Sequence, residues 1–271
     1  MSAIGHLEVG GLRLRANPAR DPCFKLVLSD TEMHEYEATH PLARREMVHR
    51  HMSNEITSLD IAAQCLADFP DAPWELRLEL ARQCWDESRH VAALARRLVE
   101  LGGTKGEFPI SAFEWNVTCA IGDLPGRLAT QNRTFEAGAM DVVGGLAAGL
   151  RAAQDPETAE VIEAILADEI QHVRFANRWI KKLVAEDRRV LLKVVAAIRF
   201  LAQANAALQA KEGDVNAVGV ALADPADRVP AVNIEDRRLA EFTDEEIQEV
   251  LRQAGFRSLS GEPGGAESAP R

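Results

Sequence analysis

The chain has 271 residues, 46% of them hydrophobic, which is enough to bury a sizeable core in one large domain with appendages. Its 31 Lys and Arg residues against 42 Asp and Glu residues leave a net charge of −11. This balance argues against a general binder of nucleic acids or anionic membranes, because both are polyanions. No apolar run approaches the roughly 18 residues of a membrane span, and residues 1–15 lack the pattern of a signal peptide.

The four cysteines form no Cys-x-x-Cys pair. Their spacing argues against rubredoxin-like iron centres, zinc ribbons and thioredoxin chemistry. We therefore expect reduced thiols in a cytoplasmic protein. Nucleic-acid and membrane partners are not expected, and a homodimer is left open.

Residues 1–40 contain short alternating stretches at 7–9 and 12–14, which predict a strand-like or irregular N-terminal arm. From Pro41 onward, apolar residues recur at helical spacing. The expected helices are 41–69, 74–101, 123–154, 155–185 and 188–211, followed by turn-forming residues over 214–232 and a short capped helix over 243–254. The tail, rich in Gly, Pro, Ser and Glu, is predicted to be disordered.

The connections between these helices indicate how they pack. Short connections join the first helix to the second and the third to the fourth, so each pair should form an antiparallel hairpin. A helix of about 28 residues is about 42 Å long, and the connection over 102–122 can travel back along it. Two hairpins joined by one long crossover form the ferritin-like four-helix bundle, an all-α fold class. The predicted organisation is an arm (1–40), a bundle (41–185), a C-terminal extension with extra helices (186–257) and a disordered tail (258–271).

Two of the helices carry the same Glu-x-x-His sequence, Glu87 to His90 in the second and Glu169 to His172 in the fourth. Residues three positions apart lie one turn apart on the same side of a helix. The first and third helices carry acids at matching places, Glu55 and Glu136, which precede the Glu of the next helix by 32 and 33 residues. The two hairpins thus repeat one arrangement, which two-fold pseudo-symmetric packing would bring to a common point.

Four carboxylates and two imidazoles can neutralise two divalent cations, and the imidazole nitrogens favour iron or manganese over calcium. An ionised acid on an apolar helix face costs several kcal/mol unless it is paired or bound to metal. The alternative is a set of buried salt bridges in which Arg89, Arg133 and Asn132 serve as partners. We disfavour it, because such a network rarely needs the two-fold spacing seen here.

Two other Glu-x-x-His sequences have no symmetric partner. Glu37 to His40 abuts the proline at the start of the first helix. Glu46 to His49 lies on the first helix, but about 180° away from Glu55 at 100° per residue. Both are predicted to be solvated surface.

Further residues are predicted to lie around the ligands. His51 precedes Glu55 by one turn. We expect it to have a structural role, and the alternatives are a hydrogen-bond partner of a ligand or an extra metal ligand. Asp86 and Asp168 each precede a ligand Glu and are placed to hold a histidine on a neighbouring helix. Asn132 and Arg133, one turn from Glu136, could orient a polar substrate. No catalytic residue is assigned beyond these positions.

The ligand pattern resembles that of the ferritin-like di-iron and di-manganese carboxylate proteins. The segments 103–109, 134–138 and 168–173, together with Trp115 and Trp179, also resemble a bacterial ferritin-like family labelled as a domain of unknown function. The resemblance covers residues 45–185. It implies the bundle fold and a metal centre of Glu55, Glu87, His90, Glu136, Glu169 and His172, but supplies no substrate.

Three functions compete on this evidence. The first is a non-haem di-iron oxidoreductase, an oxygenase or oxidase that uses O₂ on a small-molecule substrate and, if an oxygenase, takes electrons from a donor. The second is peroxide detoxification or iron handling of the manganese-catalase or peroxidase type, since the ligands also suit manganese. The third is a helical scaffold with no enzymatic role. We expect the first, with two iron ions as cofactors and manganese as the alternative.

Overall fold

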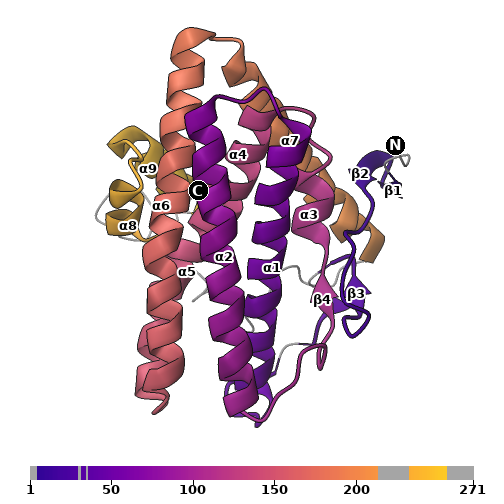
Figure 1. The fold of residues 1–271 in the computed structure, drawn as a ribbon, viewed down its shortest axis with the longest axis vertical. Coiled ribbons are helices and arrows are strands. Elements are labelled where there is room, and N and C mark those ends of the chain that lie inside the picture. The colour runs from indigo at the N-terminus through magenta and orange to yellow at the C-terminus, as the bar shows by residue number, and fades with distance from the viewer. Residues whose placement is uncertain (1–4, 30–31, 35, 213–231, 255–271) are drawn as a thin grey trace, which may run out of the picture. The chain divides into compact units, whose positions relative to one another are not determined.

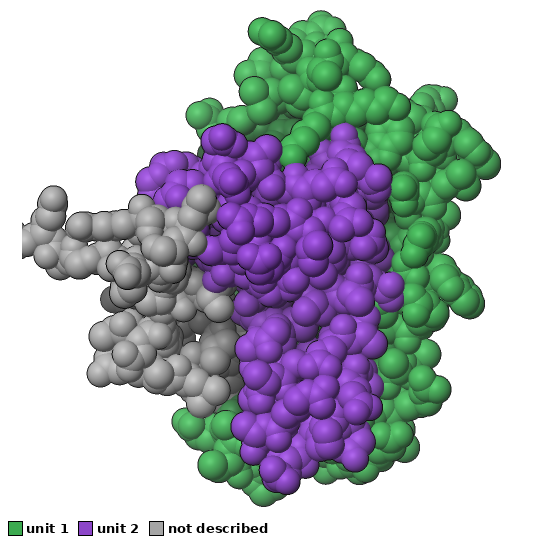
Figure 2. Space-filling model, turned by 90° about the vertical axis from the view of Figure 1, so that its left-hand side faces the viewer, with its two compact units in different colours: residues 1–135, 179–222 green, residues 136–178, 223–271 purple. Residues whose placement is uncertain are grey.

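The computed structural model describes residues 5–29, 32–34, 36–212 and 232–254. The chain divides into two compact units, residues 1–135 with 179–222 (unit 1) and residues 136–178 with 223–271 (unit 2), which Figure 2 colours separately. Helices dominate the described residues of both units (Figure 1), so the predicted all-α class is confirmed. The predicted disordered tail, 258–271, lies outside the described residues, as does nearly all of the turn-forming segment 214–232.

The N-terminal arm of unit 1 is strand-like, as the alternation predicts. Strands β1 (His6–Val9) and β2 (Leu12–Arg15) pair antiparallel, with His6 opposite Arg15 and Val9 opposite Leu12. Gly10 and Gly11 both have positive φ, which a two-residue turn between twisted strands requires. Strand β3 (Leu26–Val27) pairs in parallel with β4 (Ile110–Ser111), a strand inside the crossover that the sequence pattern did not predict.

Helices α1 (Ala43–Asp68) and α2 (Trp74–Glu100) form the expected antiparallel hairpin of unit 1. Both match the predicted ranges to within two residues at each end. Fully buried apolar side chains lie along the facing sides of the pair: Val48, Met52 and Ile61 from α1, and Leu76, Leu80, Leu94 and Leu98 from α2. The hairpin is the frame that carries half of the predicted ligands.

Unit 1 also contains α3 (Phe113–Thr118), α4 (Leu124–Thr130) and α7 (Val190–Glu212). The Asp123 side chain accepts a hydrogen bond from the Gly126 backbone N–H at 2.9 Å and so caps α4 where the sequence predicts a helix start. Helix α7 contacts α4, and its residues Leu201, Ala204 and Leu208 pack on the arm and on Val117 of α3.

Helix α7 corrects one expectation. By length and composition alone, Val190–Ala210 could cross a membrane, whereas no such segment is expected from uninterrupted apolar runs. Lys193 and Arg199 interrupt the apolar run of this helix without making its average hydropathy polar. In unit 1 one side of this helix is part of the protein core.

The predicted third helix is one helical stretch with a π-helical segment inside it. The π segment Gln131–Glu136 (η2) separates α4 from α5 (Ala137–Ala152). The Thr134 hydroxyl donates to the Ala129 carbonyl at 2.9 Å, which satisfies one acceptor in the widened turn. Such π segments occur often at functional sites, and this one ends at Glu136.

Unit 2 contains α5, the first part of α6 (Pro156–Glu186), α8 (Ile234–Leu239) and α9 (Asp244–Gln253). Helices α5 and α6 form the second predicted hairpin, and Asp155 caps α6 by accepting from the Thr158 N–H at 3.1 Å. The core of the unit joins Met140 and Val173 to Phe242, Ile247 and Leu251. Helix α9 begins with the predicted capping box at its N-terminus.

Candidate metal centre

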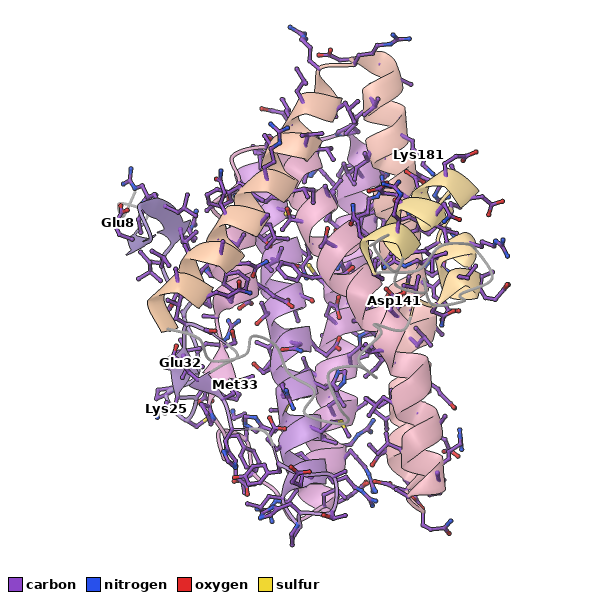
Figure 3. The ribbon with its side chains drawn as sticks, turned by 180° about the vertical axis from the view of Figure 1, so that it is seen from behind. Glu8, Lys25, Glu32, Met33, Asp141 and Lys181 are labelled. Carbon is purple, nitrogen blue, oxygen red and sulfur yellow. The ribbon has the colours of Figure 1, made fainter. Side chains whose placement is uncertain are left out.

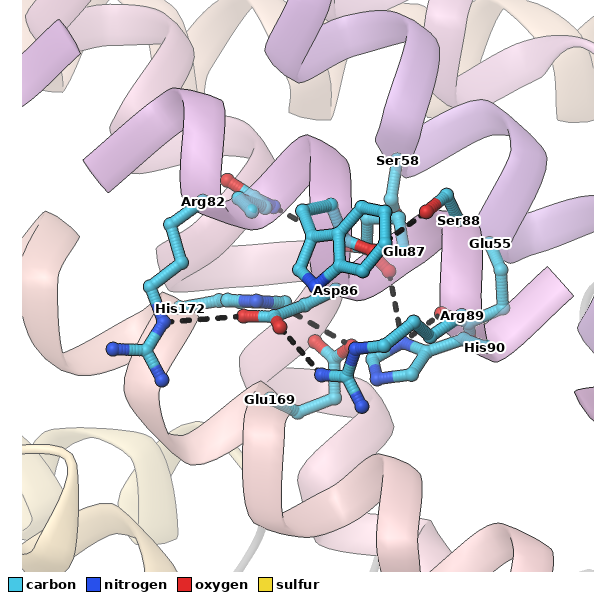
Figure 4. Close-up of polar contacts among 12 residues, drawn as sticks. Glu55, Ser58, Arg82, Asp86, Glu87, Ser88, Arg89, His90, Glu169 and His172 are labelled. Carbon is cyan, nitrogen blue, oxygen red and sulfur yellow. Dashed lines mark hydrogen bonds and ion pairs between the residues drawn. The ribbon is translucent and has the colours of Figure 1, made fainter. Parts of the chain in front are cut away.

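Three of the predicted ligands meet in unit 1, and we call them the first half-site: Glu55 on α1, and Glu87 and His90 on α2. The Nδ1 atom of His90 lies 3.0 Å from a carboxylate oxygen of Glu55 and 3.0 Å from one of Glu87 (Figure 4). The exposed fractions of the three residues are 7%, 0% and 3%. The hairpin geometry therefore places two acids and one imidazole together in a buried position.

The charges of this half-site support one another. Burial alone would lower the pKa of His90, but the hydrogen bonds and negative charges of Glu55 and Glu87 outweigh it and raise that pKa to about 11. With no metal bound, His90 is an imidazolium shared by two carboxylates. A divalent cation could replace its proton and satisfy the same two acids.

A buried hydrogen-bond chain leads to Glu87 from the π segment. Asn132 donates from Nδ2 to Oε1 of Gln83 at 3.2 Å, and Gln83 donates from Nε2 to Oε1 of Glu87 at 3.2 Å. Gln83 was not predicted as a site residue. Its position four residues before Glu87 on the same helix face was the available signal. The chain holds one carboxylate oxygen of Glu87 in a fixed direction.

Gln131 makes a second link from the π segment. Its Nε2 atom donates to the Ser58 hydroxyl at 3.0 Å, and Ser58 lies one turn after Glu55 on α1. Both side chains are buried. The segment is thus bonded to both helices of the first half-site, through α1 at Ser58 and through α2 at Gln83.

The other three predicted ligands, Glu136, Glu169 and His172, form the second half-site in unit 2. They are 4%, 5% and 2% exposed. The Nδ1 atom of His172 lies 3.6 Å from an oxygen of Glu169, its partner one turn earlier on α6. Glu136 is the last residue of the π segment.

The donor set of each half-site fits a metal ion. In each one, an oxygen atom from both glutamates and a nitrogen atom of the histidine lie within 4.8 Å of one another. Two carboxylates and one imidazole suit a divalent iron, manganese or zinc ion and leave coordination positions open. Each half-site is a buried acidic and histidine cluster that could hold a metal ion.

The residues predicted around the ligands have distinct positions. Asn132 is buried and bonded to Gln83, whereas Arg133 is half-buried. Asp86 is buried and pairs with Arg82 and Arg89 on its own helix (Figure 4). Arg89 thus binds Asp86.

The remaining two residues of that group are His51 and Asp168, and both are half-buried. Burial and the charge of Arg50 lower the pKa of His51 to about 4, so its imidazole is neutral at physiological pH. A neutral imidazole can accept a hydrogen bond or bind a metal.

The prediction that Glu46 and His49 are solvated is wrong. Their exposed fractions are 4% and 0%, and Nε2 of His49 accepts a hydrogen bond from the Gly106 backbone N–H at 3.0 Å. Phe24 and Phe108 pack edge-on against the same ring. This side of α1 does face away from Glu55, but the arm and the crossover cover it. The exposed pair Glu37 and His40 conforms to the prediction.

A family model described as "Protein of unknown function (DUF455)" matches residues 10–248. No curated protein and no solved structure matches the chain.

Proposed function

The chain belongs to the DUF455 family of proteins of unknown function, and we propose from its own residues that it is a dinuclear metal oxidoreductase, with iron in both positions, that uses O₂ to oxidise a small molecule. The observation that carries the proposal is the repetition of one buried set, Glu followed by Glu-x-x-His, in two helical hairpins. The family model matches residues 10–248. This range is longer than residues 45–185, over which the sequence motifs alone resemble a family of unknown function.

The proposal joins the two half-sites into one centre. The spacings of 32 and 33 residues between the acids of each hairpin place them at equivalent heights. Hairpins α1–α2 and α5–α6 would then pack as a ferritin-like four-helix bundle, with the crossover over 102–122 between them. In that proposed arrangement the six candidate ligands would face one another across the bundle interior.

Charge balance supports two metal ions rather than one. Four carboxylates carry four negative charges, and two divalent ions with two neutral imidazoles balance them. With one divalent ion at the second half-site, the first half-site would still hold two buried acids against one imidazolium, and the remaining negative charge would be costly. Iron and manganese both suit the mixed oxygen and nitrogen donors.

When bound, two ferrous ions would supply the electrons for O₂ reduction. The chain's own residues have other tasks. The hydrogen-bond chain through Gln83 fixes the direction of Glu87, and His90 would give up its proton if its nitrogen became a metal ligand. The near-complete burial of the candidate ligands excludes bulk water. A selective oxidant needs this exclusion.

The test compares the iron-loaded and manganese-loaded proteins. We expect the iron form to consume O₂ much faster with a substrate than without one, and neither form to dismutate hydrogen peroxide rapidly. O₂ uptake and peroxide loss are followed with and without a library of small polar molecules. The matched control is the double variant Glu37→Ala and His40→Ala, which removes an exposed Glu-x-x-His pair and should change nothing.

The peroxide-detoxifying alternative predicts the reverse outcome. Rapid peroxide dismutation by the manganese form, with no compound oxidised by the iron form, would replace the oxygenase proposal with a manganese-catalase type of function. The same result in a variant lacking Glu87 would show that a contaminant, not this centre, is responsible.

A further inference from the structure

The turn between α6 and α7 is basic in an acidic protein. Residues 179–199, all in unit 1, contain six Lys and Arg residues and two acidic residues, a net charge of +4. The remainder of the chain therefore carries −15. No acidic residue occurs between 188 and 211. The charge of the whole chain thus hides a local patch of the opposite sign.

The same segment exposes large apolar side chains. Leu191, Leu192, Val195 and Ile198 are 52%, 69%, 40% and 39% exposed. They cluster in the first turns of α7, whereas Val190, Leu201 and Leu208 on the opposite side are buried. The outward face is centred on Leu192 and Arg199, which are seven residues apart and so share a side of the helix.

Exposed cations border these apolar residues. Arg188 and Lys193 flank the two leucines in sequence, and both are exposed. Lys182 lies over the ring of Trp179 at 4.3 Å, on the last turns of α6. Figure 1 shows the α6–α7 turn as a free tip, and Figure 3 labels Lys181 on α6 just before it. Arg189 pairs with Asp187 at 3.0 Å within the turn.

We propose that this tip, residues 182–199, docks on the surface of an anionic lipid bilayer. Lys and Arg side chains would pair with lipid phosphates, while Leu191, Leu192, Val195 and Ile198 enter the boundary between headgroups and acyl chains. Charge complementarity selects this occupant. A symmetric pair of chains meeting through the same face would oppose two patches of net charge +4, which is repulsive.

The helix docks on the surface rather than crossing the membrane. Its buried side supplies Leu201, Ala204 and Leu208 to a core shared with the arm. Crossing the membrane would strip these contacts from unit 1. A surface position uses only the face that is already exposed.

The experiment is co-sedimentation of the full chain with vesicles of phosphatidylcholine alone and of an equal mixture of phosphatidylcholine and phosphatidylglycerol. We expect binding to the mixed vesicles only, and a loss of binding at high salt. Leu192→Ser should weaken binding about tenfold. Lys193→Glu and Arg199→Glu should each weaken it at least about fivefold.

Matched controls lie on α2. Val99→Ser removes an apolar residue of nearly equal exposure, 68%, and Arg96→Glu reverses an exposed cation. Both should bind like the wild type. Circular dichroism establishes that each variant is folded, and the charge variants keep the test decisive if Leu192→Ser unfolds.

Equal binding to both vesicle types, or binding unaffected by the tip variants, overturns the proposal. So does a dimer in solution that Leu192→Ser dissociates, because the tip would then be a self-interface.

Discussion

His90 is the residue on which the first half-site depends. Its Nδ1 atom lies 3.0 Å from oxygens of both Glu55 and Glu87, all three being nearly fully buried. Two buried carboxylates without a cation would be costly, and the imidazolium supplies that cation until a metal replaces it. The site is therefore compatible with folding before metal binding and with metal binding afterwards.

At the second half-site, we predict that Glu136→Ala weakens metal binding by more than about 100-fold. The metal-free variant should keep its stability, because removing one of several clustered acids relieves repulsion. Metal titration and thermal unfolding of chelator-treated protein measure the two effects, with Glu37→Ala as an exposed control. A much lower unfolding temperature of the metal-free variant would instead identify Glu136 as a structural partner.

Gln83→Leu tests the hydrogen-bond chain to Glu87. Leucine fills a similar volume but donates no hydrogen bond, so Glu87 loses a fixed direction. We predict a metal affinity lower by about 10-fold to 100-fold, with both metals still bound at saturation. Gln64→Leu is the control, because Gln64 bonds Asp68 on α1 away from the ligands. Unchanged affinity in Gln83→Leu would remove the positioning role of this residue.

The buried histidine His49 should make the folded protein less stable in acid. Burial lowers its pKa below the ordinary value, so below about pH 6.5 the unfolded chain binds a proton that the folded protein does not. The free energy of unfolding should therefore fall from about pH 7 to about pH 5, and fall less in His49→Gln, which does not titrate. Urea unfolding at both pH values measures this, with exposed His40→Gln as the control. Identical pH slopes for wild type and His49→Gln would contradict the assignment.

At the scale of elements, helix periodicity and punctuation predict α1, α2, α6 and α9 closely. Proline, glycine and capping residues define helix ends locally, so a sequence reveals them. The grouping of the six candidate ligands was also predictable, because equal spacing in two hairpins is visible without coordinates. Each half-site brings its predicted three residues together.

What the sequence did not reveal depends on tertiary contacts. The π segment that ends at Glu136 has the sequence pattern of an ordinary helix. Its side chains make tertiary hydrogen bonds, such as that from Gln131 to Ser58, which the sequence does not show. His49 was predicted to be solvated because it lies on the side of α1 away from Glu55, whereas the crossover supplies Gly106 and Phe108 to cover it. Irregular segments bury residues without any periodic signal.

Helix α8 is held to α5 by an ion pair that can be tested. Arg237 is 5% exposed and pairs with Asp141, labelled in Figure 3. We predict that Asp141→Ala destabilises unit 2 by about 3–5 kcal/mol, because it leaves a buried guanidinium without its acid. The double variant Asp141→Leu and Arg237→Leu should recover most of that loss. Urea unfolding compares them, and a double variant no more stable than Asp141→Ala would contradict this explanation.

At the scale of the whole molecule, the net charge of −11 is unevenly distributed along the chain. Acids gather inside both half-sites, where they are balanced by histidine and, in our proposal, by metal. Cations gather at the α6–α7 turn, where they border exposed leucines. The composition of the whole chain predicts no general polyanion binder, and an average of this kind does not reveal a local basic tip.

The central claim is that the two half-sites together bind two metal ions. The most direct measurement is the metal content of the full chain after anaerobic reconstitution with ferrous iron and removal of unbound metal. We predict two iron ions per chain in the wild type and in the Glu37→Ala and His40→Ala double variant, and a large loss in Glu87→Ala. A metal content near zero in wild-type protein that is fully folded by circular dichroism would contradict the account.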